Sequence, residues 1–165
     1  MSKKKILIAS LILFNTHAFA QTDGAPSAIY KSAAEIEAAL SQAGPGVDPA
    51  GAAIQISPGV SVRRRNSSVP QFAITHPWSM EIYRILEGSG TFVTGGVLNE
   101  PLADSPSRDI VRTENGITGG VARKVGVGDI LVLQPGTPYW FSEIDGEFIT
   151  YMEARIQISV HPIEY

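Results

Sequence analysis

The fold is decided by residues 75–96, THPWSMEIYRILEGSGTFVTGG, and residues 128–141, GDILVLQPGTPYWF. Each stretch joins a run of apolar and aromatic residues to a turn that contains Gly or Pro. This pattern is typical of a β-strand, a tight turn and the beginning of another strand. The pattern recurs from residue 52 onward, which predicts roughly eight to ten short strands in an antiparallel sandwich or barrel.

The spacing of polar residues and glycines in these stretches resembles the two sequence motifs of the cupin family, whose members are small β-barrels. The first cupin motif runs His-x-His, three or four residues, Glu, six residues and Gly; His76, Glu81 and Gly88 match it. The second motif runs Gly, five residues, Pro-x-Gly, two residues and His, and Gly128 and Gly136 match its glycines. The resemblance covers roughly residues 50–157. It implies an all-β, cupin-like double-stranded β-helix, or jelly-roll barrel.

The same motifs show which metal ligands are missing. In metal-binding cupins, the histidines and the glutamate of the first motif, with the histidine of the second, commonly hold one divalent cation. Here Ile74 and Tyr139 stand at two of the histidine places, and Tyr83 stands where some cupins carry another histidine. Only His76 and Glu81 remain, and two ligands rarely suffice against water. We therefore predict no metal; if a divalent or ferric ion binds, these two residues are its expected ligands.

Four polar side chains are expected to meet inside the barrel. Glu81 and Tyr83 share a face because side chains alternate along a strand, and the resemblance places His76 and Tyr139 in the same cavity. A desolvated carboxylate has a raised pKa and suits proton abstraction, with tyrosine hydroxyls as hydrogen-bond donors. Glu81, Tyr83 and Tyr139 are thus candidate catalytic residues, and His76 is a candidate ligand-binding residue. Interior groups that merely satisfy one another are the alternative.

Arg64 is a further candidate ligand-binding residue. In residues 60–65, VSVRRR, alternation puts Arg64 on the same face as the two valines, and Arg63 and Arg65 on the other. If the valines face the core, Arg64 points into the barrel mouth, where it would bind a carboxylate or phosphate through two parallel hydrogen bonds. The alternative is that all three arginines are solvated at a splayed strand end.

Three functions remain open from the sequence. The first is binding of a small, partly apolar organic molecule inside the barrel, with Trp78 and Trp140 at the cavity rim, since ligand pockets favour aromatic residues. The second is a lyase or isomerase that transfers protons through Glu81 with help from Tyr83 and Tyr139, with or without a metal. The third is a structural or interaction domain whose barrel is simply filled. Whether the protein is an enzyme is left undecided.

The first twenty residues have the composition of a secretory signal peptide. Three lysines precede an apolar run that is too short to span a membrane, and Ala18-Phe19-Ala20 provides a small-x-small cleavage pattern. We expect cleavage before Gln21, a periplasmic or secreted location, and no membrane attachment afterwards. The expected organisation is then a leader with one short helix, the barrel and a C-terminal tail, at residues 21–49, 50–157 and 158–165.

The amino-acid composition limits the classes of partner that we expect the protein to bind. The chain has 13 basic and 16 acidic residues, and removal of the three lysines of the signal peptide leaves 10 against 16, a net charge of −6. An acidic chain without basic clusters is a poor nucleic-acid binder, so a small molecule is the expected partner, and a homodimer is left open. The absence of cysteine excludes disulfides and thiolate metal sites. Residues 97–115 form a long connection, which is usually functional or poorly ordered.

Overall fold

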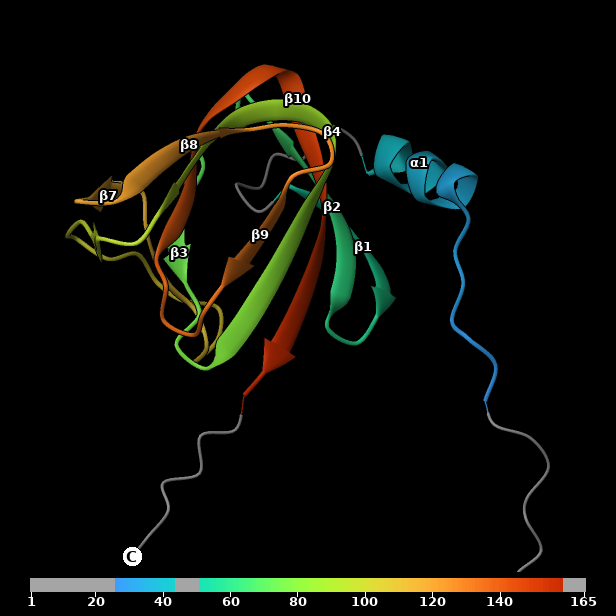
Figure 1. Ribbon diagram of the computed structural model, residues 1–165, viewed down its shortest axis with the longest axis horizontal. Helices are drawn as coiled ribbons and strands as arrows, with labels where there is room; N and C mark the ends of the chain where they lie inside the picture. The colour runs from blue at the N-terminus through green and yellow to red at the C-terminus, as the bar shows by residue number, and fades with distance from the viewer. Residues whose placement is uncertain (1–25, 44–50, 159–165) are drawn as a thin grey trace, which may run out of the picture.

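The computed structural model describes residues 26–43 and 51–158, which form one helix and ten strands (Figure 1). The all-β fold class with one N-terminal helix is confirmed. The predicted signal peptide, its cleavage site and nearly all of the C-terminal tail lie outside the described residues. The elements are α1 (Ala33–Gln42), β1 (Ala52–Ser57), β2 (Val60–Asn66), β3 (Ala73–Thr75), β4 (Ser79–Thr94), β5 (Val97–Leu98), β6 (Val111–Thr113), β7 (Ile117–Thr118), β8 (Val121–Val125), β9 (Ile130–Leu133) and β10 (Tyr139–Gln157).

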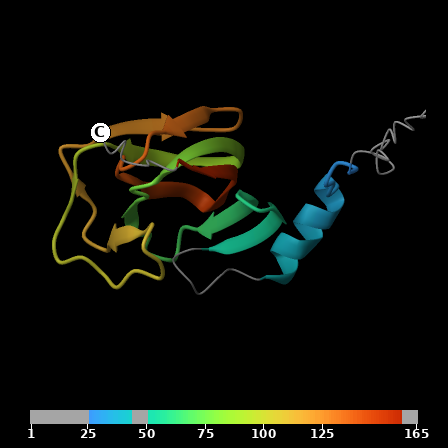
Figure 2. The same cartoon turned by 90° about the horizontal axis from the view of Figure 1, so that it is seen from below.

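Two long strands, β4 and β10, organise the barrel, and each begins in one of the two motif stretches. They pair antiparallel along almost their whole length, from Tyr139 opposite Thr94 to Gln157 opposite Ser79. Strand β4 also pairs with β8 and β9, and β10 also pairs with β2 and β3. With β1 paired to β2 and β6 paired to β3, eight strands form one sheet that curls around the core (Figures 1 and 2).

Aromatic side chains fill one part of the barrel interior. The rings of Phe92 and Phe141 lie 4.5 Å apart between centroids, and those of Tyr83 and Tyr151 lie 5.0 Å apart. Such offset and edge-to-face pairs add to the stability that burial alone provides. The buried core cluster comprises Tyr83, Ile85, Phe92, Val125, Leu133, Tyr139, Phe141, Ile149 and Tyr151.

Towards one end of the barrel the inward-facing side chains become polar. Along β4 they change from Ile85 and Tyr83 to Glu81, and along β10 they change from Tyr151 to Glu153, and all five are buried. This polar end of the interior is called the barrel mouth below. Because side chains alternate along a strand, the change in chemistry occurs on one continuous inner face.

Helix α1 covers the outer face of the β1–β2 hairpin (Figure 2). It begins with the predicted capping box, in which the Ser32 hydroxyl accepts from the Glu35 N–H and the Glu35 carboxylate accepts from the Ser32 N–H. Its apolar stripe, Ile36 and Leu40, packs against a second small cluster that includes Val62. The valines of β2 therefore face the helix and not the barrel interior. None of the described helices is long and apolar enough to cross a membrane.

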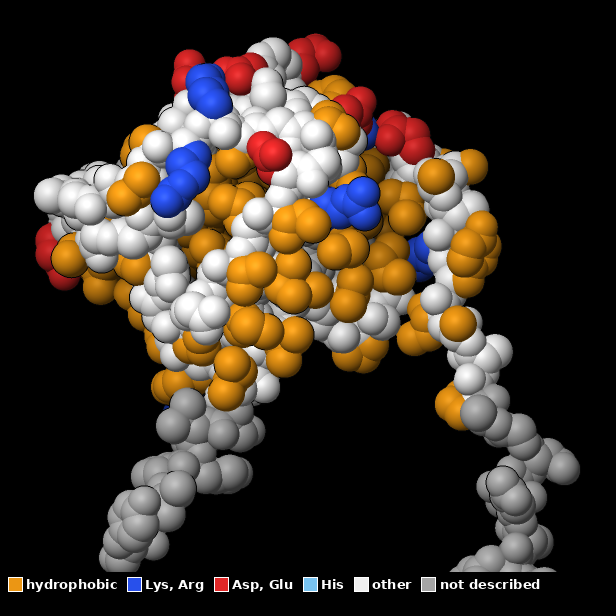
Figure 3. Space-filling view, in the orientation of Figure 1, with side chains coloured by type: hydrophobic (Ala, Val, Ile, Leu, Met, Phe, Trp, Pro, Cys, Tyr) orange, Lys and Arg blue, Asp and Glu red, His pale blue; other side chains and the backbone are white. Residues whose placement is uncertain are grey.

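The outer face of the sheet carries exposed apolar side chains, which gather where β4, β9 and β10 lie (Figure 3). Leu86 is 42% exposed, Ile130 62%, Val132 54% and Ile156 47%. Exposed apolar patches are typical of interaction surfaces. The homodimer that the sequence left open stays a prediction.

Candidate functional site at the barrel mouth

Three of the predicted site residues meet at the barrel mouth, and the fourth lies behind them. The His76 Nε2 atom lies 3.6 Å from Glu81 Oε1, and the Tyr139 hydroxyl donates to the same oxygen over 3.4 Å. The Tyr83 ring packs 5.6 Å from that of Tyr139 in an edge-to-face contact. The Tyr83 hydroxyl is near that of Tyr139, but it has no partner at ordinary hydrogen-bonding geometry in the described part of the chain.

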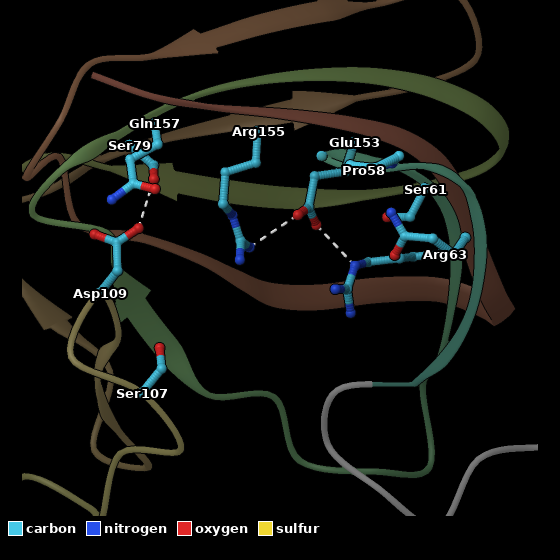
Figure 4. Close-up of a pocket in the computed structure, with 11 residues that line it drawn as sticks. Pro58, Ser61, Arg63, Ser79, Ser107, Asp109, Glu153, Arg155 and Gln157 are labelled. Carbon is cyan, nitrogen blue, oxygen red and sulfur yellow. Dashed lines mark hydrogen bonds and ion pairs between the residues drawn. The ribbon is translucent and has the colours of Figure 1, made fainter. Parts of the chain in front are cut away.

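An arginine that the sequence analysis did not identify lies in the middle of this cluster. The Nε and Nη2 atoms of Arg155 each lie 2.9 Å from Glu81 Oε1, and Nη2 lies 2.8 Å from Glu153 Oε1. The other oxygen of Glu153, Oε2, lies 2.8 Å from Arg63 Nε. Figure 4 shows Arg155, Glu153 and Arg63 in a row, their charged groups facing the same space. We call Arg63, Glu153, Arg155 and Glu81 the mouth ion network.

Strand register explains how this network forms. Arg155 lies directly opposite Glu81 in the β4–β10 pair, and side chains of directly opposed residues share a face. The sequence contains a signal for it, because residues 151–157, YMEARIQ, alternate between polar and apolar side chains. In a one-sided sheet the polar set would face water. Here Glu153 and Arg155 face inward and the apolar set faces outward, which periodicity alone does not reveal.

The prediction that Arg64 points into the barrel mouth is wrong. The alternation was right, since Arg64 shares a face with Val62, but that face lies under helix α1. The guanidinium of Arg64 is 2.9 Å from Glu37 Oε2 on the helix and 2.9 Å from Glu87 Oε2 on β4. Its Nε donates to the hydroxyl of Thr150 over 2.9 Å. Arg64 therefore fixes the helix to the sheet, and its neighbours in sequence point inward.

The two tryptophans lie outside the cavity that the ion network lines. Trp140 alternates outward between buried Tyr139 and Phe141, and its indole N–H donates to the carbonyl of Gln71 over 2.9 Å. Trp78 is 45% exposed, and its backbone N–H donates to Asp109 Oδ1. The residues that line the two pockets described next include neither ring.

Two adjoining pockets open at the barrel mouth, and both are lined by Arg63, Glu153 and Arg155. The wider pocket has a volume of about 510 Å³, within the usual range for small-molecule sites. The narrower pocket, about 130 Å³, reaches inward to His76 and Tyr139. The wider pocket is completed by Gln55, Pro58, Gly59, Ser61, Ser79, Ser107, Asp109 and Gln157. The narrower pocket is completed by Arg65, Ile74, Pro106, Ile110 and Arg112.

The predicted long connection at residues 97–115 contains two short strands, β5 and β6, and the segment between them forms one wall of these pockets. Its residue Asp109 accepts from the Ser79 hydroxyl through Oδ2, and its backbone carbonyl accepts from His76 Nδ1. This contact assigns the Nδ1–H tautomer to a neutral His76, so its Nε2 lone pair faces Glu81. Ser107 and Pro106, from the same connection, line the wider and the narrower pocket respectively.

Burial favours the neutral forms of Glu81 and His76 and shifts their pKa values in opposite directions. Burial raises the pKa of Glu81 to about 7, although the charge of Arg155 acts in the opposite direction. Burial also lowers the pKa of His76 to about 4, and the Arg155 charge adds to this effect. Desolvation raises the pKa values of Tyr83 and Tyr139 well above the ordinary tyrosine value. Both tyrosines are therefore neutral hydroxyls at neutral pH.

The residues at the mouth do not fit a metal centre. His76 Nε2 and Glu81 Oε1 face one another, but the cationic guanidinium of Arg155 already contacts that carboxylate oxygen. No group of three His, Cys, Asp or Glu residues in the described ranges could hold an ion. A tyrosinate ligand would need a phenol to lose its proton against a raised pKa.

Fold and site together define a cupin-like β-barrel with a charged, open mouth, and the strand topology confirms the fold that the two motifs predicted. No family model and no curated protein matches the chain. Among solved structures, a cupin protein from Bacteroides fragilis is similar, with 15% identity and a TM-score of 0.40 over 70% of this chain and 84% of that one. A hydroquinone 1,2-dioxygenase in complex with Cd²⁺ and 4-hydroxybenzonitrile has 13% identity and a TM-score of 0.44 over 81% of each chain.

The cupin domain of Drosophila melanogaster CENP-C is a further similar structure. It has 17% identity and a TM-score of 0.39 over 59% of this chain. The chain spans 56% of that structure and 61% of a second one, in which CENP-C is bound to CAL1, which is less than two thirds of either. At these identities the likeness concerns the fold alone.

Proposed function

We propose that the protein binds a small organic molecule in the mouth of its barrel. One observation carries the proposal: a pocket of about 510 Å³ adjoins a narrower one, and the two share the Arg63, Glu153 and Arg155 wall. Charged side chains gathered at a cavity wall are the groups that orient and select a ligand. The deeper interior is filled by aromatic rings, so the ligand lies at the mouth and not in the centre of the barrel.

A second candidate function, proton-transfer catalysis through Glu81, has one specific observation in its favour. Its raised pKa of about 7 suits a general acid or base at neutral pH. However, Glu81 is 1% exposed and is not among the residues that line either pocket. His76 and Glu153 do line them, so they would contact a substrate first. We therefore favour binding over catalysis.

A thermal-shift screen of a metabolite library, with a pocket-filling variant, tests the proposal. A ligand at a hundredfold excess over its dissociation constant stabilises the folded state by about 2.7 kcal/mol. Ser107→Trp places a large ring at the wall of the wider pocket and should abolish stabilisation by any hit. Ser105→Trp is the matched control, because Ser105 is exposed in the same connection but does not line the pocket.

The two outcomes separate the candidate functions. A hit that stabilises the protein and the Ser105→Trp variant, but not the Ser107→Trp variant, and that is recovered unchanged supports binding. A hit that is converted to product, at a rate lost on Glu81→Gln with an unchanged melting temperature, favours the enzyme. If the library gives no stabilisation that Ser107→Trp removes, the proposed function is wrong.

Export from the cell is proposed from the N-terminal sequence alone, and it is tested by determining the first residue of the mature protein.

A further inference from the structure

Charge is unevenly distributed between the two pockets. Among the described residues, four arginines and one glutamate line the narrower pocket, and His76 there is neutral at neutral pH. Glu81 contacts one of these arginines, Arg155, from behind the wall, so the arginines still outnumber the carboxyl groups by four to two. Two arginines and two carboxylates, Glu153 and Asp109, line the wider one. Cavity walls of one charge sign focus the electrostatic potential and concentrate ligands of the opposite sign. The inner pocket therefore favours an anionic group, whereas the wider pocket is close to balanced.

The arginines at the junction of the pockets hold unused donors. Arg63 contacts Glu153 through Nε alone, as an ion pair without hydrogen-bonding geometry, and its two terminal nitrogens make no hydrogen bond within the described ranges. Glu153 also contacts Arg155, so one carboxylate lies between the two guanidinium groups and pairs with both. Arg112 donates to the carbonyl of Asp104 and lies over the Phe72 ring, and neither contact neutralises its charge. A planar guanidinium held in this way matches the two oxygens of a carboxylate or of a phosphate.

The wider pocket has a different character, because it contains no large apolar side chain. Most drug-sized ligands bind in predominantly apolar cavities. Here the wall presents hydroxyls and amides instead, and the side chains of Ser61, Ser107 and Gln157 have no hydrogen-bond partner in the part of the chain that the structure describes. Groups of this kind pair with ligand hydroxyls, and they would remain unpaired against a hydrocarbon chain.

We propose that the ligand is a small polyhydroxylated organic anion, whose carboxylate or phosphate is held at the Arg63–Arg155 junction and whose hydroxyls lie in the wider pocket. This inference rests on the proposed function and deepens it by naming the ligand class. It replaces the partly apolar molecule expected from the sequence, because the tryptophans that suggested an apolar rim lie elsewhere. The sugar-acid and sugar-phosphate classes share this chemistry.

Four six-carbon probes separate the contributions of charge and hydroxyls in isothermal titration calorimetry. Gluconate has both features, sorbitol has hydroxyls without charge, hexanoate has charge without hydroxyls, and 1-hexanol has neither. We expect gluconate to bind at least tenfold more tightly than each of the other three. Glucose 6-phosphate against glucose forms a second pair, which distinguishes a phosphate from a carboxylate as the anionic group.

Two arginine substitutions locate the anion site. Arg63→Gln keeps Glu153 paired with Arg155, so the fold is expected to survive, and it should weaken gluconate or glucose 6-phosphate binding at least tenfold. Arg63→Lys keeps the charge but loses the planar fork, and it should give an intermediate loss. Arg84→Gln is the matched control, because Arg84 is exposed on the outer side of β4 and lines neither pocket. Circular dichroism and the melting temperature confirm that each variant is folded.

The outcomes distinguish this inference from the function on which it rests. If sorbitol or hexanol binds as tightly as gluconate, or if Arg63→Gln and Arg84→Gln behave alike, the anion class is wrong and the proposed pocket still stands. If hexanoate binds as tightly as gluconate, the hydroxyl requirement is wrong. If no probe and no library compound binds in a manner sensitive to Ser107→Trp, both the inference and the proposed function are overturned.

Discussion

Arg155 and Glu81 lie directly opposite one another on β10 and β4, and both Nε and Nη2 of the arginine lie 2.9 Å from Glu81 Oε1. The carboxylate is 1% exposed, so it depends on protein partners in place of water. The register of the two longest strands places the pair at the barrel mouth. Arg155 thus supplies, from within the chain, a positive charge next to the motif glutamate.

Removing the arginine should therefore destabilise the protein. Arg155→Met removes a charged partner from two buried carboxyl groups, Glu81 and Glu153. We expect a loss of about 3 kcal/mol in the free energy of unfolding, the lower end of the range for a broken buried pair, because the Arg155 side chain is 28% exposed. Urea denaturation at neutral pH measures the loss.

A double-mutant cycle provides the control for this loss. Glu81→Gln removes the charge that Arg155 balances, so the combination of Arg155→Met with Glu81→Gln should cost less than the sum of the two single changes. A coupling free energy close to zero would show that the ion pair contributes nothing to folding. Arg84→Met, on the exposed side of β4, controls for the loss of an arginine side chain as such.

The opposite pKa shifts of Glu81 and His76 predict opposing pH dependences of stability. The pKa of Glu81 rises from 4.5 to about 7 on folding. Between these two pH values the folded state retains a proton that the unfolded state has lost. Its contribution to stability falls as pH rises. The pKa of His76 falls from 6.5 to about 4 on folding, so between these two pH values the unfolded state retains a proton that the folded state has lost. The contribution of His76 to stability therefore rises with pH. In the pH range that the two windows share, from 4.5 to 6.5, the two contributions to stability offset one another.

Single substitutions should reveal each contribution. Relative to the wild type, Glu81→Gln should gain stability as pH rises from about 5 to 8, and His76→Gln should lose stability as pH rises from about 4 to 6.5. Each slope is at most about 1.4 kcal/mol per pH unit. Urea denaturation across this pH range measures them, with the exposed Glu147→Gln as control. Parallel pH profiles for all four proteins would contradict the assignment.

The fold could be predicted from the sequence because it depends on short-range signals. Alternating apolar runs, turn glycines and the Ser32–Glu35 capping box each specify local structure, and two motifs of fixed spacing connect them. The convergence of His76, Glu81 and Tyr139 follows from the same motifs. Arg155 and Glu153 lie more than seventy positions after Glu81 in chain order, and only strand register brings them together. Register is a tertiary property that one sequence does not show.

Arg64 illustrates the other limit of sequence analysis. Alternation determined which residues share a face, but it did not determine which face was the interior. Both faces of β2 are covered, one by helix α1 and the other by the rest of the barrel. An apolar residue such as Val62 therefore does not mark the barrel side. Polar residues on the opposite face then line the cavity, as Arg63 does.

The hydroxyls of the buried tyrosines should differ in their contribution to the free energy of unfolding. The Tyr83 hydroxyl is buried without a hydrogen-bond partner in the described ranges, so Tyr83→Phe should be neutral or stabilising, by up to about 1 kcal/mol. The Tyr151 hydroxyl accepts from Arg65 Nε over 2.6 Å, so Tyr151→Phe should cost about 1.5–3 kcal/mol. Urea denaturation of both variants measures the difference. Equal losses would show that the Tyr83 hydroxyl has a partner after all.

Two motif glycines allow a matched test of backbone requirements. Gly88 and Gly136 both adopt the left-handed region, with φ of 75° and 78°. An added Cβ at Gly88 would clash with the Phe148 carbonyl oxygen, whereas at Gly136 it would meet nothing within 4 Å. Gly136→Ala should cost about 1–2 kcal/mol from the backbone alone. Gly88→Ala should cost about 1–3 kcal/mol more, because strand β10 must shift. Similar melting temperatures for the two variants would contradict this account.

The cupin resemblance suggests a bound metal ion, but the residues at the barrel mouth oppose one. A divalent ion between His76 Nε2 and Glu81 Oε1 would lie against the Arg155 guanidinium, which already contacts that oxygen. Like charges at such short range in a desolvated site repel strongly. We expect the protein, purified without added metal, to contain well below one equivalent of Mn, Fe, Zn, Ni or Cu by elemental analysis.

The arginine itself makes this prediction testable in both directions. If Arg155 opposes a cation, Arg155→Gln should raise the affinity for Zn²⁺ or Mn²⁺ relative to the wild type, because it frees the Glu81 oxygen and removes the competing charge. Calorimetric titration of both proteins measures the change, and adding His76→Ala to Arg155→Gln should abolish it. Close to one metal ion per wild-type chain, lost on His76→Ala, would overturn the prediction and make catalysis at the mouth the favoured function.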